Sequence, residues 1–150
     1  LTDLAVIEPA AIATRCGQVI LYQLTEPGRK TCTLLGIDPG PAPRESLEHR
    51  YWVQQTARHF ERQGYAIALE HPIRGNGAVD LLASRPGERI AIEVETGKSD
   101  VKSNLHNGAK GGFDRLILIA TSPAAVAACE RAIKDAGGTA AELLTWLDLE

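Results

Sequence analysis

Three acidic side chains lie in two neighbouring apolar segments, where carboxylates are otherwise rare. Asp80 stands in the first segment, and Glu93 and Glu95 stand at the end of the second. Because side chains alternate between the two faces of a strand, Glu93 and Glu95 share one face, and Ile90, Ile92 and Val94 share the other. Two carboxylates side by side on a strand repel each other. We therefore expect a cation between them.

The short connection between the two segments predicts which residues face each other. Arg85-Pro86-Gly87-Glu88 has the composition of a turn. If these four residues form the loop, Ser84 faces Arg89, and counting back along both strands sets Asp80 opposite Glu93. Directly paired residues point to the same face, with Cβ atoms about 5 Å apart. The hairpin thus predicts that three carboxylates converge on one patch.

A cluster of three carboxylates offers the oxygen ligands that Mg²⁺ and Mn²⁺ prefer over imidazole or thiolate. Such a site can generate a hydroxide beside a phosphorus atom and stabilise charge on phosphate oxygens, as phosphodiester hydrolysis requires. The alternative is that Glu93 and Glu95 lie on a solvent-facing surface, where Arg89 and Lys98 neutralise them.

Helical and strand patterns alternate from residue 46 onward. Ser46 is placed to cap a helix that ends before Gly64. The strands expected after it cover 65–71, 78–84, 89–95, 115–121 and 140–147, and the helices cover 99–110, capped by Ser99, and 123–136. The last strand is ambiguous with helix. The order α-β-β-β-α-β-α-β predicts an α/β fold, with a mixed central sheet flanked by helices.

The N-terminal part of the chain has a different pattern. Apolar runs over 4–14 and 19–25 around a Gly-containing turn predict a β-hairpin. Residues 36–43 hold three prolines and two glycines, which indicates a linker. Residues 17–29 resemble the wing of a winged-helix domain, although a hairpin packed on the main domain is the alternative. The expected parts are a hairpin over 1–35, a linker over 36–45 and a main domain over 46–150.

The main domain also resembles a known superfamily. Gly77-Ala78-Val79-Asp80-Leu81-Leu82, a turn and Ile90-Ala91-Ile92-Glu93-Val94-Glu95 are similar to the PD-(D/E)XK nucleases, and the resemblance covers about residues 46–137. Asp80 matches the first acid of the motif, Glu93 matches the second, and Glu95 stands where the motif usually has Lys. The resemblance implies a restriction-endonuclease-like α/β/α core and a Mg²⁺- or Mn²⁺-dependent endonuclease that hydrolyses DNA. Its catalytic and metal-binding acids would be Asp80, Glu93 and Glu95, in the E-x-E version that some active restriction enzymes carry.

Basic residues that follow the motif are candidates for the missing Lys and for DNA contacts. Lys102, His106 and Lys110 are spaced i, i+4 and i+8, so they share one face of the helix over 99–110. The apolar face is expected to hold Val101, Leu105 and Ala109. Lys98 or Lys102 would replace the motif Lys. The candidate DNA contacts are Lys98, Lys102, His106, Lys110 and Asn76. The basic face could equally be an ordinary solvated surface.

The resemblance adds two further expectations. Superfamily members often supply an acid from the first core helix, and Glu48 is the candidate for this additional metal ligand. They also often act as homodimers so that both DNA strands are cut, and a homodimer is therefore a candidate assembly.

Composition limits where and how such a protein works. The formal net charge of −3 over 150 residues is unusual for a DNA-binding protein, but bound divalent cations would neutralise a carboxylate-rich site. The sequence has neither a membrane-length apolar run nor a signal peptide, so we expect a cytoplasmic protein without a membrane partner. Cys16, Cys32 and Cys129 are expected to be buried thiols. Because the first residue is Leu, we expect a piece of a longer chain.

Two other functions remain open at this level. The first is a catalytically inactive DNA-binding or assembly module of a larger DNA-processing protein, which the Glu at position 95 and the net acidity both favour. The second is a small-molecule enzyme. It is less favoured because no glycine-rich phosphate loop follows a strand.

Overall fold

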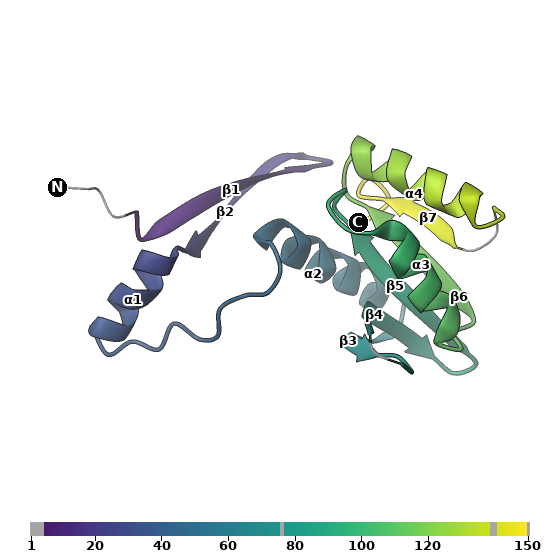
Figure 1. Cartoon of the computed structure of the whole chain (residues 1–150), viewed down its shortest axis with the longest axis horizontal. Coiled ribbons are helices and arrows are strands. Elements are labelled where there is room, and N and C mark those ends of the chain that lie inside the picture. The colour runs from purple at the N-terminus through teal and green to yellow at the C-terminus, as the bar shows by residue number, and fades with distance from the viewer. Residues whose placement is uncertain (1–4, 76, 139–140, 150) are drawn as a thin grey trace. The chain divides into compact units, whose positions relative to one another are not determined.

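The computed structural model describes residues 5–75, 77–138 and 141–149. Its elements are labelled in Figure 1. Contacts within the chain divide it into two compact units, Leu1–Arg50 and Tyr51–Glu150. Each unit has a sheet of its own, with two strands in the first unit and five in the second.

The sheet of the first unit is an antiparallel hairpin. β1 (Ile7–Thr14) pairs with β2 (Gly17–Leu24) in a regular register that runs from Ile7↔Leu24 to Thr14↔Gly17. Gly17 adopts a φ of +123°, a conformation that glycine takes without steric cost and that allows the tight reversal of the chain. The N-terminal hairpin expected from the sequence is confirmed.

A helix that the sequence analysis missed follows the hairpin. The side chain of Thr25 caps α1 (Glu26–Leu34) by accepting a hydrogen bond from the Gly28 N–H at 3.0 Å, and Pro27 lies in the first turn. A Cβ on Gly28 would lie 1.9 Å from the Val6 carbonyl oxygen, so only glycine fits this approach of helix to backbone. A hairpin alone was therefore an incomplete prediction for residues 1–35.

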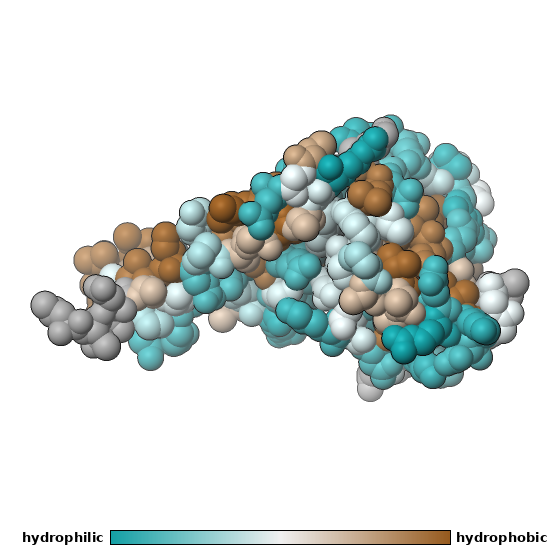
Figure 2. Space-filling view, turned by 90° about the horizontal axis from the view of Figure 1, so that it is seen from above, coloured by the Kyte–Doolittle hydropathy of each residue, from teal (hydrophilic) through white to brown (hydrophobic). Residues whose placement is uncertain are grey.

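The first unit leaves large apolar side chains exposed. Ile7, Ile20 and Tyr22 share one face of the hairpin, because the pairs to which they belong follow one another at intervals of two residues along each strand. Each of the three side chains is at least half exposed. Figure 2 shows brown apolar patches over this unit. A two-stranded sheet with one short helix is too small to cover both of its own faces.

The second unit contains the mixed sheet. The sheet order is β3-β4-β5-β6-β7, in which β3, β4 and β5 are antiparallel neighbours and β5, β6 and β7 are parallel neighbours. The elements in chain order, with α2 starting in the first unit, are α2 (Leu47–Arg62), β3 (Ala66–Pro72), β4 (Ala78–Arg85), β5 (Glu88–Glu95), α3 (Val101–Lys110), β6 (Arg115–Ala120), α4 (Pro123–Asp135) and β7 (Glu142–Thr145). This order confirms the predicted α/β fold with a mixed sheet.

Helices lie on both sides of this sheet. Every residue of β6 after Arg115 is buried, as expected of a parallel strand that is covered on two faces. Figure 1 shows α3 and α4 on one side of the sheet and α2 on the other. The buried core on the α3 and α4 side consists of Val79, Ala91, Val101, Leu105, Leu116, Leu118, Ala120, Ala125, Cys129 and Ala132.

Capping residues define where the helices begin. The Ser46 hydroxyl accepts a hydrogen bond from the His49 N–H at 3.1 Å, and Ser122 caps α4 in the same way, as the sequence predicts. The prediction for α3 was wrong by one residue, because Asp100 rather than Ser99 is its cap. The Ser99 hydroxyl bonds Glu95 instead.

Two of the three cysteines differ from the prediction. Cys129 is buried, but Cys16 is exposed in the hairpin turn and Cys32 is half-buried, and all three are free thiols. The prediction that Cys16 is buried was wrong. The residue lies in a two-residue turn, where few neighbours can cover its side chain. Among the described helices, none combines the length and apolarity needed to cross a membrane.

Candidate acidic centre

The β4–β5 hairpin has the register that its turn sequence predicted. Ser84 pairs with Arg89, although Arg85 and Glu88 also pair, so the loop itself contains only two residues. Gly87 takes a φ of +81° in this loop, which the glycine makes possible. Counting from the Ser84↔Arg89 pair therefore gave the correct alignment of the two strands.

Asp80 and Glu93 lie one step beyond the last ladder pair, Leu81↔Ile92. The Val94 N–H donates to Asp80 Oδ2 at 2.7 Å, and the Asp80 N–H donates to Glu93 Oε2 at 3.4 Å. Side-chain oxygens thus replace backbone carbonyls as acceptors where the two strands separate. This exchange brings the two acidic residues into direct contact.

The other neighbour of β4 is also irregular beside Asp80. The β3–β4 ladder contains the pairs Leu69↔Leu81 and His71↔Val79, and between them Glu70 adopts a φ of +47°. A left-handed backbone is costly for any residue other than glycine, and such strain is concentrated at functional sites in proteins. Asp80 therefore lies at a local break in the pairing of β4 with both of its neighbours.

Burial and charge make Glu93 an unusual carboxyl group. Its side chain is 4% exposed. Burial is the main reason that its pKa rises to about 9, and the negative charge of Asp80 adds to the rise, with a smaller contribution from Glu95. At neutral pH the Asp80–Glu93 pair therefore holds a proton, in a position where a cation could replace it.

Glu95 is fully buried and both of its carboxylate oxygens have partners. The Ser99 hydroxyl donates to Glu95 Oε2, and Asn104 Nδ2 donates to Glu95 Oε1 at 2.8 Å. Glu95 is two residues from Glu93 on the same strand face, which is the face of Ala91 and of the α3–α4 core. Among the described side chains, Asp80, Glu93 and Glu95 do not bring one oxygen each to within 4.8 Å of one another.

The basic candidates occupy different environments. Lys102 Nζ forms an ion pair with Asp135 of α4 at 2.8 Å, and this carboxylate raises the pKa of the Lys102 ammonium. Lys98, in the turn before α3, and His106 and Lys110, on α3, are exposed. The structure therefore leaves all four of these basic side chains at the surface, with Lys102 in an ion pair to α4.

The remaining predicted residues are placed as follows. Glu48 lies in the first turn of α2, within the first unit. Asn76 lies outside the described residues. The prediction that Ala109 belongs to the apolar face of α3 was wrong, because Ala109 is exposed. Gly108, rather than Ala109, is buried with Val101 and Leu105. A Cβ on Gly108 would lie 2.7 Å from a methyl carbon of Leu116, so a larger residue there would have to displace the Leu116 side chain.

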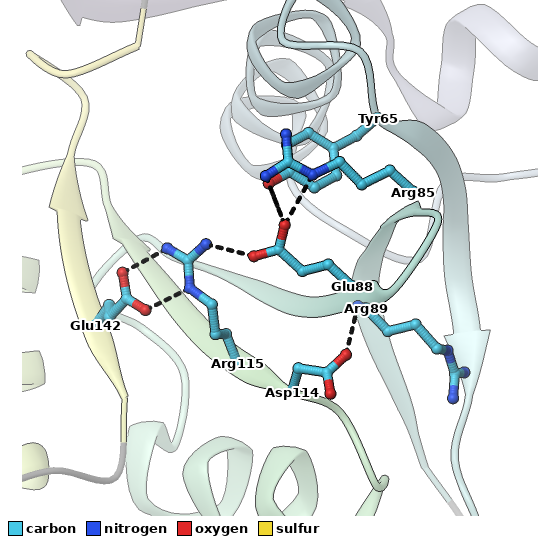
Figure 3. Close-up of polar contacts among 7 residues, drawn as sticks. All are labelled: Tyr65, Arg85, Glu88, Arg89, Asp114, Arg115 and Glu142. Carbon is cyan, nitrogen blue, oxygen red and sulfur yellow. Dashed lines mark hydrogen bonds and ion pairs between the residues drawn. The ribbon is translucent and has the colours of Figure 1, made fainter.

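A second polar network, which the sequence analysis missed, lies at the opposite ends of β4 and β5. Figure 3 shows Arg115 between two carboxylates, donating to Glu142 through two nitrogens at 2.6 and 2.7 Å and to Glu88 at 2.9 Å. Tyr65 and Arg85 also donate to Glu88, and these bonds help to lower the pKa of the Glu88 carboxyl. Two surface hollows border this network, and neither is lined by Asp80 or Glu93.

Comparison with known proteins adds little to this geometry. No protein-family model matches the sequence. No curated protein sequence matches it. One similar solved structure is the crystal structure of the YaeQ protein from Xanthomonas axonopodis pv. citri, with 11% sequence identity and a TM-score of 0.43 over 94% of this chain and 72% of that one. At this level the likeness identifies neither a family nor an activity.

Proposed function

We propose that this chain contains a metal-dependent endonuclease that hydrolyses phosphodiester bonds of DNA. The observation that carries the proposal is the contact between Asp80 and Glu93 where β4 and β5 separate. Carboxylates that are forced together beside a strained backbone are typical of a functional site rather than of a stabilising one.

The donor chemistry of this pair fits a hard divalent cation. Two carboxylates from adjacent strands supply oxygen ligands, and Mg²⁺ is commonly bound through one or two carboxylates together with waters and substrate phosphates. Asp80 and Glu93 would hold the ion. When bound, Mg²⁺ or Mn²⁺ supplies an activated water and neutralises charge on the phosphate. The Glu95 carboxylate accepts hydrogen bonds from Ser99 and Asn104 in this structure, so it would not be one of the metal ligands.

The protein side chains have separate tasks in this proposal. The Val94 N–H holds the Asp80 carboxylate in place, and Glu93 would release its proton to solvent if it is to hold the cation. Lys98, His106 and Lys110 are exposed and would contact the DNA phosphates. Lys102 would have to exchange its ion pair with Asp135 for a phosphate.

The resemblance to the PD-(D/E)XK nucleases supports the same conclusion independently of the contact. Asp80, Glu93 and Glu95 fall on the D…E-x-E version of the motif. The described element order around them, α-β-β-β-α-β-α-β, is the one on which the resemblance rested.

Nicking of supercoiled plasmid DNA in Mg²⁺ or Mn²⁺, with and without EDTA, tests the proposal. We expect the wild type to cleave DNA and EDTA to abolish this cleavage. Asp80→Asn and Glu93→Gln should lower the cleavage rate by at least about a hundredfold, because residues that only support a metal ligand already cost up to about that much. Glu130→Gln on the exposed face of α4 is the matched control and should cleave normally. Full metal-dependent cleavage by both site variants would exclude the proposal.

A second function has a specific observation in its favour. Glu95 occupies the position of the motif Lys, and it is bonded to α3 rather than free. A catalytically inactive module that binds DNA or assembles with a larger DNA-processing protein would tolerate this arrangement. DNA binding that persists in EDTA, without nicking in either metal, would favour this alternative.

A further inference from the structure

Glu95 connects the acidic centre to α3. It follows Glu93 by two residues on one strand face, and its two oxygens accept hydrogen bonds from Ser99, just before α3, and from Asn104, inside α3. A fully buried carboxylate is costly unless its oxygens are satisfied. Glu95 is satisfied by α3 rather than by solvent or by a basic side chain.

The backbone at Glu95 adds a second attachment. The Thr121 N–H donates to the Glu95 carbonyl oxygen at 3.0 Å, and the Thr121 hydroxyl donates to the same atom at 3.2 Å. β5 is thereby tied to the end of β6 at the residue whose side chain holds α3. The position of Glu95 is fixed by bonds from two different segments, so it can transmit that position to the helix.

The helix that Glu95 holds carries little apolar surface with which to hold itself. Val101, Leu105 and Gly108 are its buried residues, and one of these is a glycine. Small apolar contacts leave the orientation of a ten-residue helix sensitive to polar bonds at its start. The Ser99 and Asn104 bonds therefore contribute to where the N-terminal half of α3 lies against β4 and β5.

We propose that Glu95 is a positioning residue, which acts through Ser99 and Asn104 to hold α3 against the two strands that carry the acidic centre, and that it is not a metal ligand. The inference rests on the proposed metal site at Asp80 and Glu93. It assigns to Ser99 and Asn104 a role in metal affinity, although neither would touch the ion.

The double variant Ser99→Ala/Asn104→Ala separates this role from that of a ligand, because it changes no charge and leaves Glu95 in place. We expect Mn²⁺ affinity to fall about tenfold, the lower end of the loss typical of residues that support a metal site without touching the metal. Backbone amide exchange in α3 should quicken by about tenfold. Ala109→Gln is the matched control, because this exposed position of α3 bonds neither Glu95 nor the Asp100 cap, so both readouts should stay at the wild-type value.

Glu95→Gln is a second variant that preserves the clamp. Its amide oxygen can accept from Asn104 while its amide nitrogen donates to the Ser99 hydroxyl, which accepts as readily as it donates. Exchange in α3 should therefore match the wild type in Glu95→Gln and quicken in Glu95→Ala. This comparison needs no bound metal, so it remains decisive if the wild type binds no Mn²⁺, a result that would reject the proposed function alone.

Three results would overturn the inference. Unchanged exchange in α3 in Ser99→Ala/Asn104→Ala or in Glu95→Ala would show that the bonds do not hold the helix. Faster exchange in the double variant with unchanged Mn²⁺ affinity would reduce Glu95 to a structural residue. Tighter Mn²⁺ binding in the double variant would mean that the released Glu95 carboxylate joins the ion as a ligand.

Discussion

The Asp80 N–H donates to Glu93 Oε2 one step past the end of the β4–β5 ladder. A strand residue that ordinarily pairs through its carbonyl oxygen here pairs through a carboxyl group. The arrangement keeps Glu93 buried against the charge of Asp80, and it costs the folded state free energy whenever Glu93 ionises. The acidic centre is therefore assembled at the expense of stability.

The stability of the protein should fall as the pH rises from about 5 to 9. Unfolded Glu93 ionises near its ordinary pKa of 4.5, whereas folded Glu93 keeps its proton up to a pKa of about 9. Between these values the unfolded state binds fewer protons than the folded state, so the free energy of unfolding decreases as the pH rises. The decrease is at most about 1.4 kcal/mol for each unit by which the two pKa values differ. Urea denaturation at several pH values measures the slope.

Glu93→Gln is the variant that checks this pH dependence. It removes the titrating group while keeping the shape of the side chain, so its stability curve should be flatter and should lie above that of the wild type at pH 8. Glu130→Gln, with its exposed carboxyl, should follow the wild type. Parallel curves for Glu93→Gln and the wild type would contradict the assignment of the raised pKa.

Divalent cations should stabilise the folded protein through the same pair. A ligand that binds only the folded state at a hundred times its Kd adds about 2.7 kcal/mol to the free energy of unfolding. We expect Mn²⁺ to raise the Tm of the wild type and of Glu130→Gln. Asp80→Asn and Glu93→Gln should not respond, although both remain folded. An equal rise in all four proteins would place cation binding elsewhere.

The sequence predicted the centre as far as local patterns reach. The composition of the Arg85–Glu88 turn set the register, and the register brought Asp80 beside Glu93. Alternation along β5 correctly put Glu95 on the face of Glu93. These relationships depend only on the two-residue period of strands and on the length of one turn.

Relationships between distant segments could not be predicted in the same way. The partners of Glu95 depend on where α3 begins, and the sequence analysis placed the cap at Ser99 rather than at Asp100. The left-handed conformation of Glu70 has no sequence signal, because non-glycine residues rarely adopt it. Helix α1 was different, since Thr25 followed by Pro27 is a recognisable start that the apolar run before it obscured.

Replacing Glu70 should reveal the strain beside Asp80. Glu70→Gly removes the steric cost of a φ of +47°, which is about 1–2 kcal/mol, and part of this gain is offset by the flexibility of glycine in the unfolded chain. Glu70→Ala removes the same carboxylate and keeps the strain, so it is the matched control. Glycine should therefore be the more stable of the two by up to about 1 kcal/mol in urea denaturation. Equal stability would show that the backbone relaxes at no cost.

Arg115 should stabilise the end of the sheet opposite the acidic centre, and this stabilisation should decrease at low pH. Its two bonds to Glu142 lower the pKa of that carboxyl, so they contribute stability above the ordinary pKa and lose it as the pH falls through the lowered value. Arg115→Met should therefore lower the Tm by a few degrees at pH 7, a modest loss because the ion pairs are partly exposed to solvent. The difference from the wild type should shrink at pH 3, where Glu88 and Glu142 take up protons.

Arg131→Met on the exposed surface of α4 controls for the loss of one positive charge, and its Tm should follow the wild type at both pH values. If Arg115→Met lowers the Tm equally at pH 7 and pH 3, the aliphatic stem of Arg115 rather than its guanidinium supplies the stability. A loss confined to pH 7 means that the charges of Glu88 and Glu142 repel each other once the arginine between them is removed. The far end of the parallel strands would then depend on one cation, as the acidic end is proposed to depend on another.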